Sequence, residues 1–477
     1  MAKPKGKTVF VCGDCGNESL QWRGRCSSCG AWNSYAEFKT GGSSNSQTAW
    51  LGPGQEEPTQ LSTIVVEESN RLVLPFGEVN RVLGGGVVAG SVVLLAGDPG
   101  IGKSTLLLQI ADAASKARGK VLYVSGEEST TQIKMRADRL GISGDGLFLF
   151  GATDVGSILS QLDAQKPSLA VVDSIQTTYA SDVPSGSGSA TQVRECTLRL
   201  TRWAKATMTP MFLSGHVTKG GEVAGPKVLE HMVDVVLYLE GESLGLLRLL
   251  RGVKNRFGST NEVGVFEMKG SGLVEVEDPS KAFLSEHRDG AIGSAIVPTL
   301  EGSRPMLVEI QALTNPSVLP SPRRAANGVD FNRVLLVGAV LSRRTGFSVS
   351  NQDVLVNVAG GLHIEEPSAD LGIALAIASS LRNMPITAST TVIGEIGLGG
   401  EIRQVPQLER RVAEVARLGF RRCLVPSSSE RKNNRDDKLE LVPVSTLAEA
   451  ISFGLDRKQR KVPVGGQEPD AFDSLGQ

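Results

Sequence analysis

Short apolar runs alternate with helix-forming segments through the middle of the chain. Five runs rich in β-forming residues are predicted to be buried strands, at 91–96, 120–125, 169–173, 211–214 and 234–239. Helix-forming segments such as 106–114 and 130–140 lie between them. Strands that alternate with helices are typical of an α/β domain with a mainly parallel central sheet. We therefore predict such a domain over residues 60–275.

Changes in composition divide the rest of the chain. Residues 41–46, GGSSNS, are typical of a flexible linker. A second alternation of strands and helices begins near residue 290, and the polar tail has the composition of a disordered segment. The predicted organisation is a small module at 1–40, a linker at 41–59, the first α/β domain at 60–275, a linker at 276–289, a second α/β domain at 290–455 and a disordered tail at 456–477.

Composition excludes some classes of protein. The 477 residues are 40% hydrophobic and 21% charged, with a net charge of −1. Because no global basic field exists, a nucleic-acid-binding surface would have to be local. No apolar run approaches the roughly 18 residues that span a bilayer. The first ten residues, MAKPKGKTVF, lack the apolar core of a secretion signal. We expect a cytoplasmic protein that does not contact membranes.

The sequence GDPGIGKST, at 97–105, fits the pattern of a phosphate-binding loop. An apolar run precedes it and a helix-forming segment follows. A glycine-rich turn in that position directs backbone N–H groups at phosphates, at the positive end of a helix dipole. The lysine would contact the phosphates, and the serine hydroxyl would bind Mg²⁺. The residues predicted to hold a nucleoside triphosphate are Gly97, Asp98, Pro99, Gly100, Ile101, Gly102, Lys103, Ser104 and Thr105.

Acidic residues follow two of the predicted strands. Glu127 and Glu128 come just after the strand at 120–125. One of these carboxylates could orient and deprotonate water, while the other caps or solvates the next helix. The run at 169–173 consists of four apolar residues and then Asp173, which is the form of a Walker B strand that holds Mg²⁺. A surface aspartate that ends a strand is the alternative interpretation.

Four of the six cysteines form two C-x-x-C pairs near the N-terminus. In a cytosolic chain such pairs indicate a metal rather than disulfides. Two turns that each present two thiolates complete a tetrahedral Zn²⁺ site, and the metal would supply much of the folding free energy of so short a segment. The predicted ligands are Cys12, Cys15, Cys26 and Cys29. Trp22, Arg23 and Arg25 could contact a partner or DNA, but a purely structural module fits equally well.

Basic and polar positions elsewhere in the first α/β domain extend the picture. Lys254 and Arg256 alternate on a strand-like segment and so share one face. They could reach across a subunit boundary and stabilise the γ-phosphoryl charge, although composition alone favours a solvated basic strand. Polar, glycine-containing loops are predicted at 179–192 and 218–227. Backbone amides and the lysines Lys219 and Lys227 in such loops could follow the phosphates of a single strand.

Five motifs in order, GDPGIGKST, SGEES, LAVVDS, LSGHVTKGG and KNRFG, resemble the RadA (Sms) family of bacterial recombination proteins. With the cysteine module in front, the resemblance extends from Cys12 to about Gly454. It implies a RecA-like ATPase core in which Glu127 activates water. It also implies that His216 is a polar sensor, although a lone histidine there could also be a packing residue. The loops at 179–192 and 218–228 would face DNA. The signature motif is Lys254, Asn255, Arg256, Phe257 and Gly258, whose two cations would complete a neighbour's active site.

The second α/β domain is similar to the proteolytic domain of Lon, through GGLHIEEPSADLGIA at 360–374 and GEIGLGGE at 394–401. Ser368 matches the nucleophile of Lon, but the position of the activating lysine falls on Arg411. Arginine stays protonated and cannot act as the base. We therefore predict an inactive scaffold in which Ser368 is a helix N-cap. Basic pairs at 323–324 and 343–344 leave room for a DNA-binding surface.

The family resemblance implies a function. It predicts a DNA-dependent ATPase of homologous recombination and the DNA-damage response, with ATP, Mg²⁺ and Zn²⁺ as cofactors. The protein would form a hexameric ring, move along single-stranded DNA and promote branch migration in intermediates made by RecA. Its partners would be single-stranded and branched DNA, RecA and further copies of the chain. An ATP-dependent protease and a nucleotide-gated DNA-binding scaffold are the alternatives.

Overall fold

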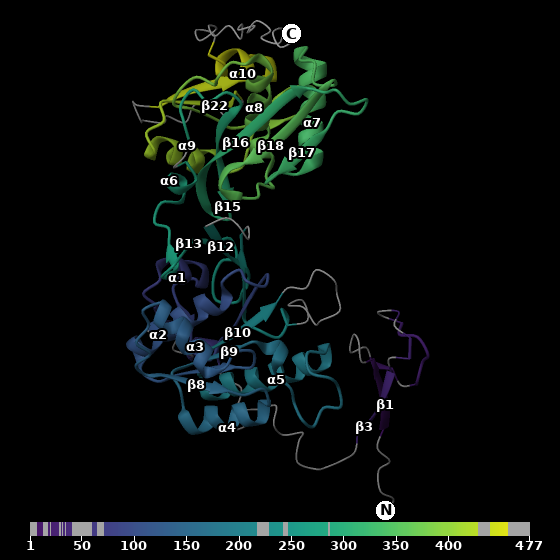
Figure 1. Cartoon of the computed structure of the whole chain (residues 1–477), viewed down its shortest axis with the longest axis vertical. Coiled ribbons are helices and arrows are strands. Elements are labelled where there is room, and N and C mark those ends of the chain that lie inside the picture. The colour runs from purple at the N-terminus through teal and green to yellow at the C-terminus, as the bar shows by residue number, and fades with distance from the viewer. Residues whose placement is uncertain are drawn as a thin grey trace, which may run out of the picture. The chain divides into compact units, whose positions relative to one another are not determined.

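The computed structural model describes residues 7–12, 18–19, 21–27, 30, 32–33, 35–40, 60–63, 71–216, 229–241, 247–284, 287–427 and 439–456 (Figure 1). The chain divides into two compact units. The first comprises Met1–Glu277 and Glu301–Arg304, and the second comprises Asp278–Leu300 and Pro305–Gln477. We consider each unit by itself.

The N-terminal module is a small antiparallel sheet. Its strands are β1 (Lys7–Cys12), β2 (Glu18–Ser19) and β3 (Tyr35–Thr40), in the order β2-β1-β3. The interior of this module is a cluster of Cys12, Cys26 and Tyr35, with Phe10 packed against it. An interior of this size has little apolar surface to bury, so it needs another source of stability.

A nine-stranded sheet forms the centre of the first unit, in the order β14-β13-β12-β11-β6-β10-β9-β7-β8. The strands from β11 to β8 are parallel, and β12, β13 and β14 continue the sheet antiparallel. Their bounds are β6 (Val92–Gly97), β7 (Val121–Ser125), β8 (Leu147–Gly151), β9 (Leu169–Asp173), β10 (Met211–His216), β11 (Val235–Glu240), β12 (Leu247–Asn255), β13 (Val263–Lys269) and β14 (Gly272–Glu275). The five predicted strands are confirmed, with ends that differ by at most two residues.

Helices cover both faces of this sheet, which explains why its central strands are buried and mainly apolar. In β6, Val93 and Leu95 pack into one core cluster, and Val92 and Leu94 pack into the other. The first cluster takes residues from α2 and α3, and the second from α4 and α5. The helices and short elements are η1 (Leu61–Thr63), β4 (Arg71–Leu72), α1 (Gly77–Leu83), β5 (Val87–Val88), α2 (Lys103–Arg118), α3 (Thr130–Arg139), α4 (Val155–Gln165), η3 (Ile175–Thr177) and α5 (Ala190–Thr207).

The second unit is built on a seven-stranded sheet with the order β17-β18-β16-β15-β19-β22-β23. Its strands are β15 (Ser294–Glu301), β16 (Arg304–Pro316), β17 (Arg324–Asn327), β18 (Gln352–Val358), β19 (Thr390–Val392), β22 (Arg422–Pro426) and β23 (Glu440–Val444), with a separate pair β20 (Glu395–Ile396) and β21 (Ile402–Arg403). Its helices are α6 (Pro279–Phe283), α7 (Phe331–Thr345), η5 (Ala359–Gly361), η6 (Pro367–Ala369), α8 (Asp370–Arg382), α9 (Leu408–Arg417) and α10 (Leu447–Gly454). The whole first part of α8 is buried, which makes this helix the centre of the unit.

The observed elements confirm that both predicted domains are of the α/β class. The segment predicted as a linker at 276–289 includes α6, so part of it is helical. In the described ranges, every helix is too short or too polar to cross a lipid bilayer.

Candidate nucleotide site

The phosphate-loop sequence joins the end of β6 to the start of α2. The loop passes so close to the sheet that two of its residues must lack a side chain. A Cβ at Gly97 would lie 2.5 Å from the carbonyl oxygen of Leu239. Gly102 has a φ of 116°, and a Cβ there would lie 2.6 Å from the terminal methyl of Met268. These glycines therefore hold the loop where β6 ends, and Asp98, Pro99 and Gly100 remain exposed.

Lys103 is 3% exposed and folds back over this loop. Its Nζ donates to the carbonyl oxygens of Gly97 and Asp98, both at 2.9 Å. Burial lowers the pKa of Lys103, while the carboxylates of Asp173, Glu127 and Asp98 act in the opposite direction. A cation held by neutral carbonyl groups in a glycine loop fits phosphate oxygens, since these can accept the same hydrogen bonds and carry opposite charge.

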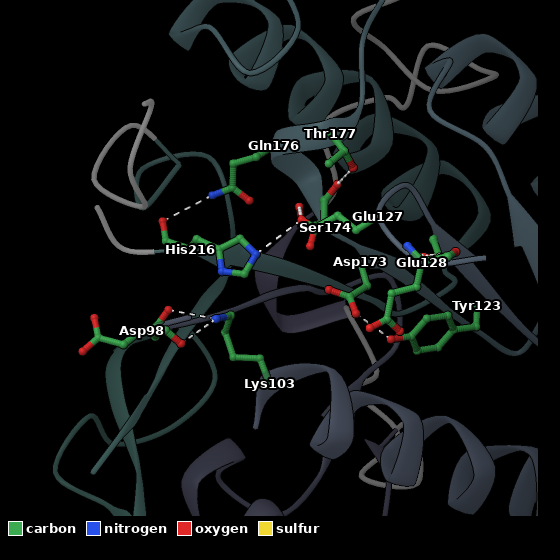
Figure 2. Close-up of polar contacts among 12 residues, drawn as sticks. Asp98, Lys103, Tyr123, Glu127, Glu128, Asp173, Ser174, Gln176, Thr177 and His216 are labelled. Carbon is green, nitrogen blue, oxygen red and sulfur yellow. Dashed lines mark hydrogen bonds and ion pairs between the residues drawn. The ribbon is translucent and has the colours of Figure 1, made fainter. Parts of the chain in front are cut away.

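Strand register brings the predicted acids to the same edge as the loop. In the parallel pairs, Ser125 lies opposite Asp173, and His216 lies opposite Gly97. The carboxyl ends of β6, β7, β9 and β10 therefore converge, and this edge is where open α/β sheets bind ligands. Figure 2 shows Lys103, Asp173, Glu127 and His216 gathered around one space.

Asp173 ends β9 and is 8% exposed. The Tyr123 hydroxyl, from the middle of the neighbouring β7, donates to its Oδ2 at 2.7 Å. Burial, together with the charge of Asp173, raises the pKa of Tyr123 well above its usual value, so the hydroxyl keeps its proton. Ser104, in the first turn of α2, and Asp173 supply oxygen ligands of the kind that Mg²⁺ prefers. Tyr123 belongs to no sequence motif, and only the parallel pairing of β7 with β9 places it within reach of Asp173.

The structure separates Glu127 from Glu128. Glu127 Oε1 accepts a hydrogen bond from the Ser174 hydroxyl at 2.5 Å and lies 3.3 Å from His216 Nε2. Glu128 instead forms an ion pair with Arg136. Neither glutamate caps α3, because Ser129 is the N-cap and forms a capping box with Gln132. The cap alternative is therefore wrong, whereas Glu128, partly exposed and paired with Arg136 of α3, fits the alternative that one glutamate solvates that helix. The geometry favours Glu127 as the site carboxylate.

His216 ends β10, and its main-chain carbonyl accepts a hydrogen bond from Nε2 of Gln176 at 3.3 Å. In the described residues, no hydrogen-bond partner is found for two buried atoms here, His216 Nδ1 and Gln176 Oε1.

Of the two loops predicted to face DNA, only the one at 179–192 is described, and Lys219 and Lys227 lie outside the described residues. In the loop at 179–192, the Gln192 side chain bonds to main-chain groups of Ala180, Val183 and Ser185. That loop is therefore held in a defined conformation.

Comparison with known proteins identifies the family of the chain. A family model for the AAA domain matches residues 55–222, one for subunit ChlI of Mg-chelatase matches 327–429, and one for a rubredoxin metal-binding domain matches 10–37. The DNA repair protein RadA of Listeria monocytogenes is 48% identical over 456 residues, which are 95% of this chain and 100% of that protein. Its Bacillus subtilis counterpart is 49% identical over 458 residues, with the same coverage. The chain belongs to the RadA family.

Among solved structures, a KaiC-like protein from Pyrococcus horikoshii is similar, with 20% identity and a TM-score of 0.37. The match covers 43% of this chain and 98% of that one.

The signature motif of this RadA-family chain lies at the other edge of the sheet. Asn255 pairs with Val235, which pairs with Val93 near the start of β6, whereas the phosphate loop follows the end of β6. The antiparallel direction of β12 thus carries Lys254 and Arg256 away from their own chain's loop. At the rise of about 3.3 Å per residue in a strand, the separation is roughly 13 Å.

Main-chain and acidic groups hold this motif in place. Lys254 Nζ donates to the carbonyl oxygens of Glu230 and Val233, the latter at 2.9 Å. Arg256 lies 3.2 Å from the buried carboxylate of Asp234. Desolvation, with a contribution from Arg256, lowers the pKa of Lys254.

The other three residues of the motif are held by close contacts. The Asn255 side chain accepts a hydrogen bond from the amide N–H of Phe257, and Arg71 donates to the carbonyl of Phe257 at 2.9 Å. Gly258 packs closely against Gly84.

Two of the four predicted zinc ligands lie in the described residues of the N-terminal module. Cys12 and Cys26 are buried in one cluster with Tyr35, whose hydroxyl lies 3.7 Å from Sγ of Cys26. Cys15 and Cys29 lie outside the described residues. The two thiols thus lie in the same small interior, which fits a shared metal site.

The predicted N-cap role of Ser368 is wrong. The residue lies in η6, and Ala369 occupies the N-cap position of α8. Ser368 Oγ instead accepts a hydrogen bond from Nη1 of Arg411 at 3.0 Å. Arg411 is 1% exposed, forms an ion pair with Glu366 and donates to the carbonyl of Pro298 at 2.8 Å. The Arg411 guanidinium thus binds the serine oxygen that was predicted to cap α8.

The Arg411–Glu366 pair should dominate the stability of the second unit. Arg411→Met should lower its free energy of unfolding by about 3–5 kcal/mol, because Glu366 loses its buried partner. Thermal or denaturant unfolding measures the loss, and Arg421→Met, at an exposed arginine just before β22 in the same unit, is the matched control. Burial opposes ionisation of Glu366, but Arg411 outweighs it and lowers the pKa. Since the folded pKa lies below the unfolded one, the difference between wild type and variant should shrink as the pH falls through the acid range. Equal stability of both variants at neutral pH would contradict a structural role for the pair.

Proposed function

We propose that this protein is a DNA-dependent ATPase of DNA repair and homologous recombination. It uses ATP hydrolysis to move along single-stranded DNA and to promote branch migration in intermediates made by RecA. The DNA repair proteins to which the chain is 48–49% identical support the cellular role. One observation carries the ATPase activity: Lys103, Asp173 and Glu127 converge on the phosphate loop at one sheet edge.

The proposed roles of the site residues follow from their positions. Main-chain N–H groups of the loop and the Lys103 ammonium bind the β- and γ-phosphates. Ser104 and Asp173 hold Mg²⁺, which when bound neutralises charge on the phosphate oxygens. Glu127 orients the attacking water and accepts its proton. His216, hydrogen-bonded to Glu127 at one end of β10, senses the state of the site and passes it to the loop that follows.

Lys254 and Arg256 are proposed to act in a neighbouring subunit. Within one chain they lie at the sheet edge opposite the phosphate loop, a position that supports action on the nucleotide of another subunit. A head-to-tail ring would bring this edge to the site of the next subunit, where the two cations stabilise the charge of the transferred phosphoryl group. A hexamer is the proposed ring. The loops at 179–192 and 218–228, with Lys219 and Lys227, would then face DNA in its centre.

The terminal domains have separate proposed roles. The N-terminal module binds Zn²⁺ through Cys12, Cys15, Cys26 and Cys29, which the match to a rubredoxin metal-binding domain supports. The second unit is proposed to be a scaffold without proteolytic activity. Ser368 contacts the Arg411 guanidinium, which stays protonated and cannot remove the serine's proton.

Steady-state ATP hydrolysis with and without single-stranded DNA tests this function. We expect DNA to increase turnover at least about tenfold, because DNA bound in the ring would fix the neighbouring cations against the γ-phosphate. Turnover that is indifferent to DNA would overturn the motor. A casein-cleavage assay on the same preparation should show no activity, and ATP-dependent cleavage would favour the protease alternative.

A further inference from the structure

Both carboxylates of the nucleotide site are held by a hydroxyl group, and each through one oxygen only. The Tyr123 hydroxyl donates to Oδ2 of Asp173, and the Ser174 hydroxyl donates to Oε1 of Glu127 (Figure 2). His216 Nε2 lies 3.3 Å from that same Oε1. Across the described part of the chain, no hydrogen bond reaches Oδ1 of Asp173 or Oε2 of Glu127. In each of the two carboxylates, therefore, one oxygen accepts a hydrogen bond within the protein and the other is left for a ligand.

Such hydrogen bonds have a specific effect on carboxylates. The last side-chain torsion of aspartate and glutamate is broad and roughly two-fold, so an unheld carboxylate rotates. A donor on one oxygen fixes the carboxylate plane and hence the direction of the other oxygen. Tyr123 is 1% exposed and Ser174 is fully buried, so both donors are themselves immobilised by packing. The orientation of both acids thus exists before any ligand binds.

We propose that Tyr123 and Ser174 are positioning residues. Each holds one oxygen of a carboxylate and thereby orients the other oxygen for its function in the nucleotide site. Tyr123 occupies Oδ2 of Asp173 and so leaves Oδ1 to bind Mg²⁺, which Ser104 would also hold. Ser174 leaves Oε2 of Glu127 to accept the proton of the attacking water. The oxygen of that water forms a bond to the γ-phosphorus, and the bond from this phosphorus to the bridging oxygen breaks, which yields ADP and phosphate. This inference rests on the proposed ATPase function.

Tyr123→Phe tests the Asp173 half through equilibrium binding. A fluorescent N-methylanthraniloyl ATP is titrated at a series of Mg²⁺ concentrations. The half-saturating Mg²⁺ concentration should rise about tenfold, the scale of one hydrogen bond to a charged group. Affinity in EDTA should stay close to wild type, and a cooperative thermal transition verifies that the variant is folded. Tyr238→Phe removes a hydroxyl from β11 of the same sheet and is the matched control. An unchanged Mg²⁺ dependence in Tyr123→Phe would overturn this half.

Ser174→Ala tests the Glu127 half without touching the buried tyrosine. We expect kcat to fall about tenfold or more, with the affinity for the fluorescent nucleotide and its Mg²⁺ dependence unchanged. Ser174→Thr should restore most of kcat, because it keeps the hydroxyl. Ser168→Ala removes a hydroxyl at the opposite end of β9 and should behave as wild type. An unchanged kcat, or a joint loss of affinity and kcat, would contradict the positioning role.

The wild-type protein separates the two possible failures. If it binds no Mg²⁺-nucleotide or hydrolyses none, the proposed ATPase function fails. If it does both and the variants match it, the ATPase stands and only the positioning role of Tyr123 and Ser174 is wrong.

Discussion

Lys103→Ala is expected to lower ATP turnover by about 100- to 1,000-fold, the scale reported for removing one preorganised donor to transition-state charge. The Lys103 ammonium is 3% exposed and is held by two loop carbonyls, so it is positioned before nucleotide binds. A positioned, desolvated cation stabilises developing phosphoryl charge without reorganisation. Phosphate release measures turnover, and binding of the fluorescent ATP analogue should weaken in parallel.

A lysine on the same helix provides the control. Lys116 lies near the far end of α2, 56% exposed, and pairs with Asp112. Lys116→Ala removes the same charge without touching the loop and should hydrolyse ATP normally. Normal ATP turnover in Lys103→Ala would show that the phosphate loop is not part of the catalytic site.

Lys254→Ala should retain nucleotide binding but lose DNA-stimulated hydrolysis by about 1,000-fold, the lower range for a cation supplied to a neighbour's phosphoryl group. Lys254 lies at the sheet edge opposite the phosphate loop of its own chain. Removing the lysine side chain should therefore leave that loop intact. Nucleotide affinity and turnover are measured on the same protein. Lys205→Ala is the control, since Lys205 is bound to Asp234 as Arg256 is but belongs to α5.

Mixing the two inactive variants gives the sharper test. A Lys103→Ala subunit still carries Lys254, and a Lys254→Ala subunit still has an intact phosphate loop. In a mixed ring the first can complete the site of the second, so turnover should recover, whereas each variant alone stays inactive. Co-purification through two different tags shows that mixed oligomers form. Mixed oligomers without recovered turnover would contradict the action of Lys254 in a neighbour.

The sequence predicted those features that depend on neighbouring residues. The five central strands were located within two residues, because a strand buried on both faces is an uninterrupted apolar run. The end of β10 was the least well placed, since Gly215 and His216 extend the strand by pairing with Ala96 and Gly97. The motif also located the loop, whose glycines the structure requires by close approach.

Other features depended on partners distant in the chain. The local sequence pattern alone does not distinguish Glu127 from Glu128. Ser174, just after β9, and His216, at the end of β10, contact Glu127, whereas Glu128 pairs with Arg136. Ser368 follows Pro367 before a helix and so resembles an N-cap, yet it bonds to Arg411, 43 residues away. Tyr123 looked like one more apolar strand residue until β9 was placed beside β7.

By itself, the sequence determined the α/β class, the buried strands and the phosphate loop, because periodicity and motif spacing are local properties of a chain. The family resemblance pointed to Glu127, but only the tertiary structure showed which contacts distinguish it from Glu128, which hydroxyls bond to the two acids, and on which edge Lys254 lies. Those depend on strand order and register, which bring together side chains 47 to 89 positions apart. For the buried donors Tyr123 and Ser174 the hydrogen bonds matter most, since most buried polar groups in folded proteins are hydrogen-bonded.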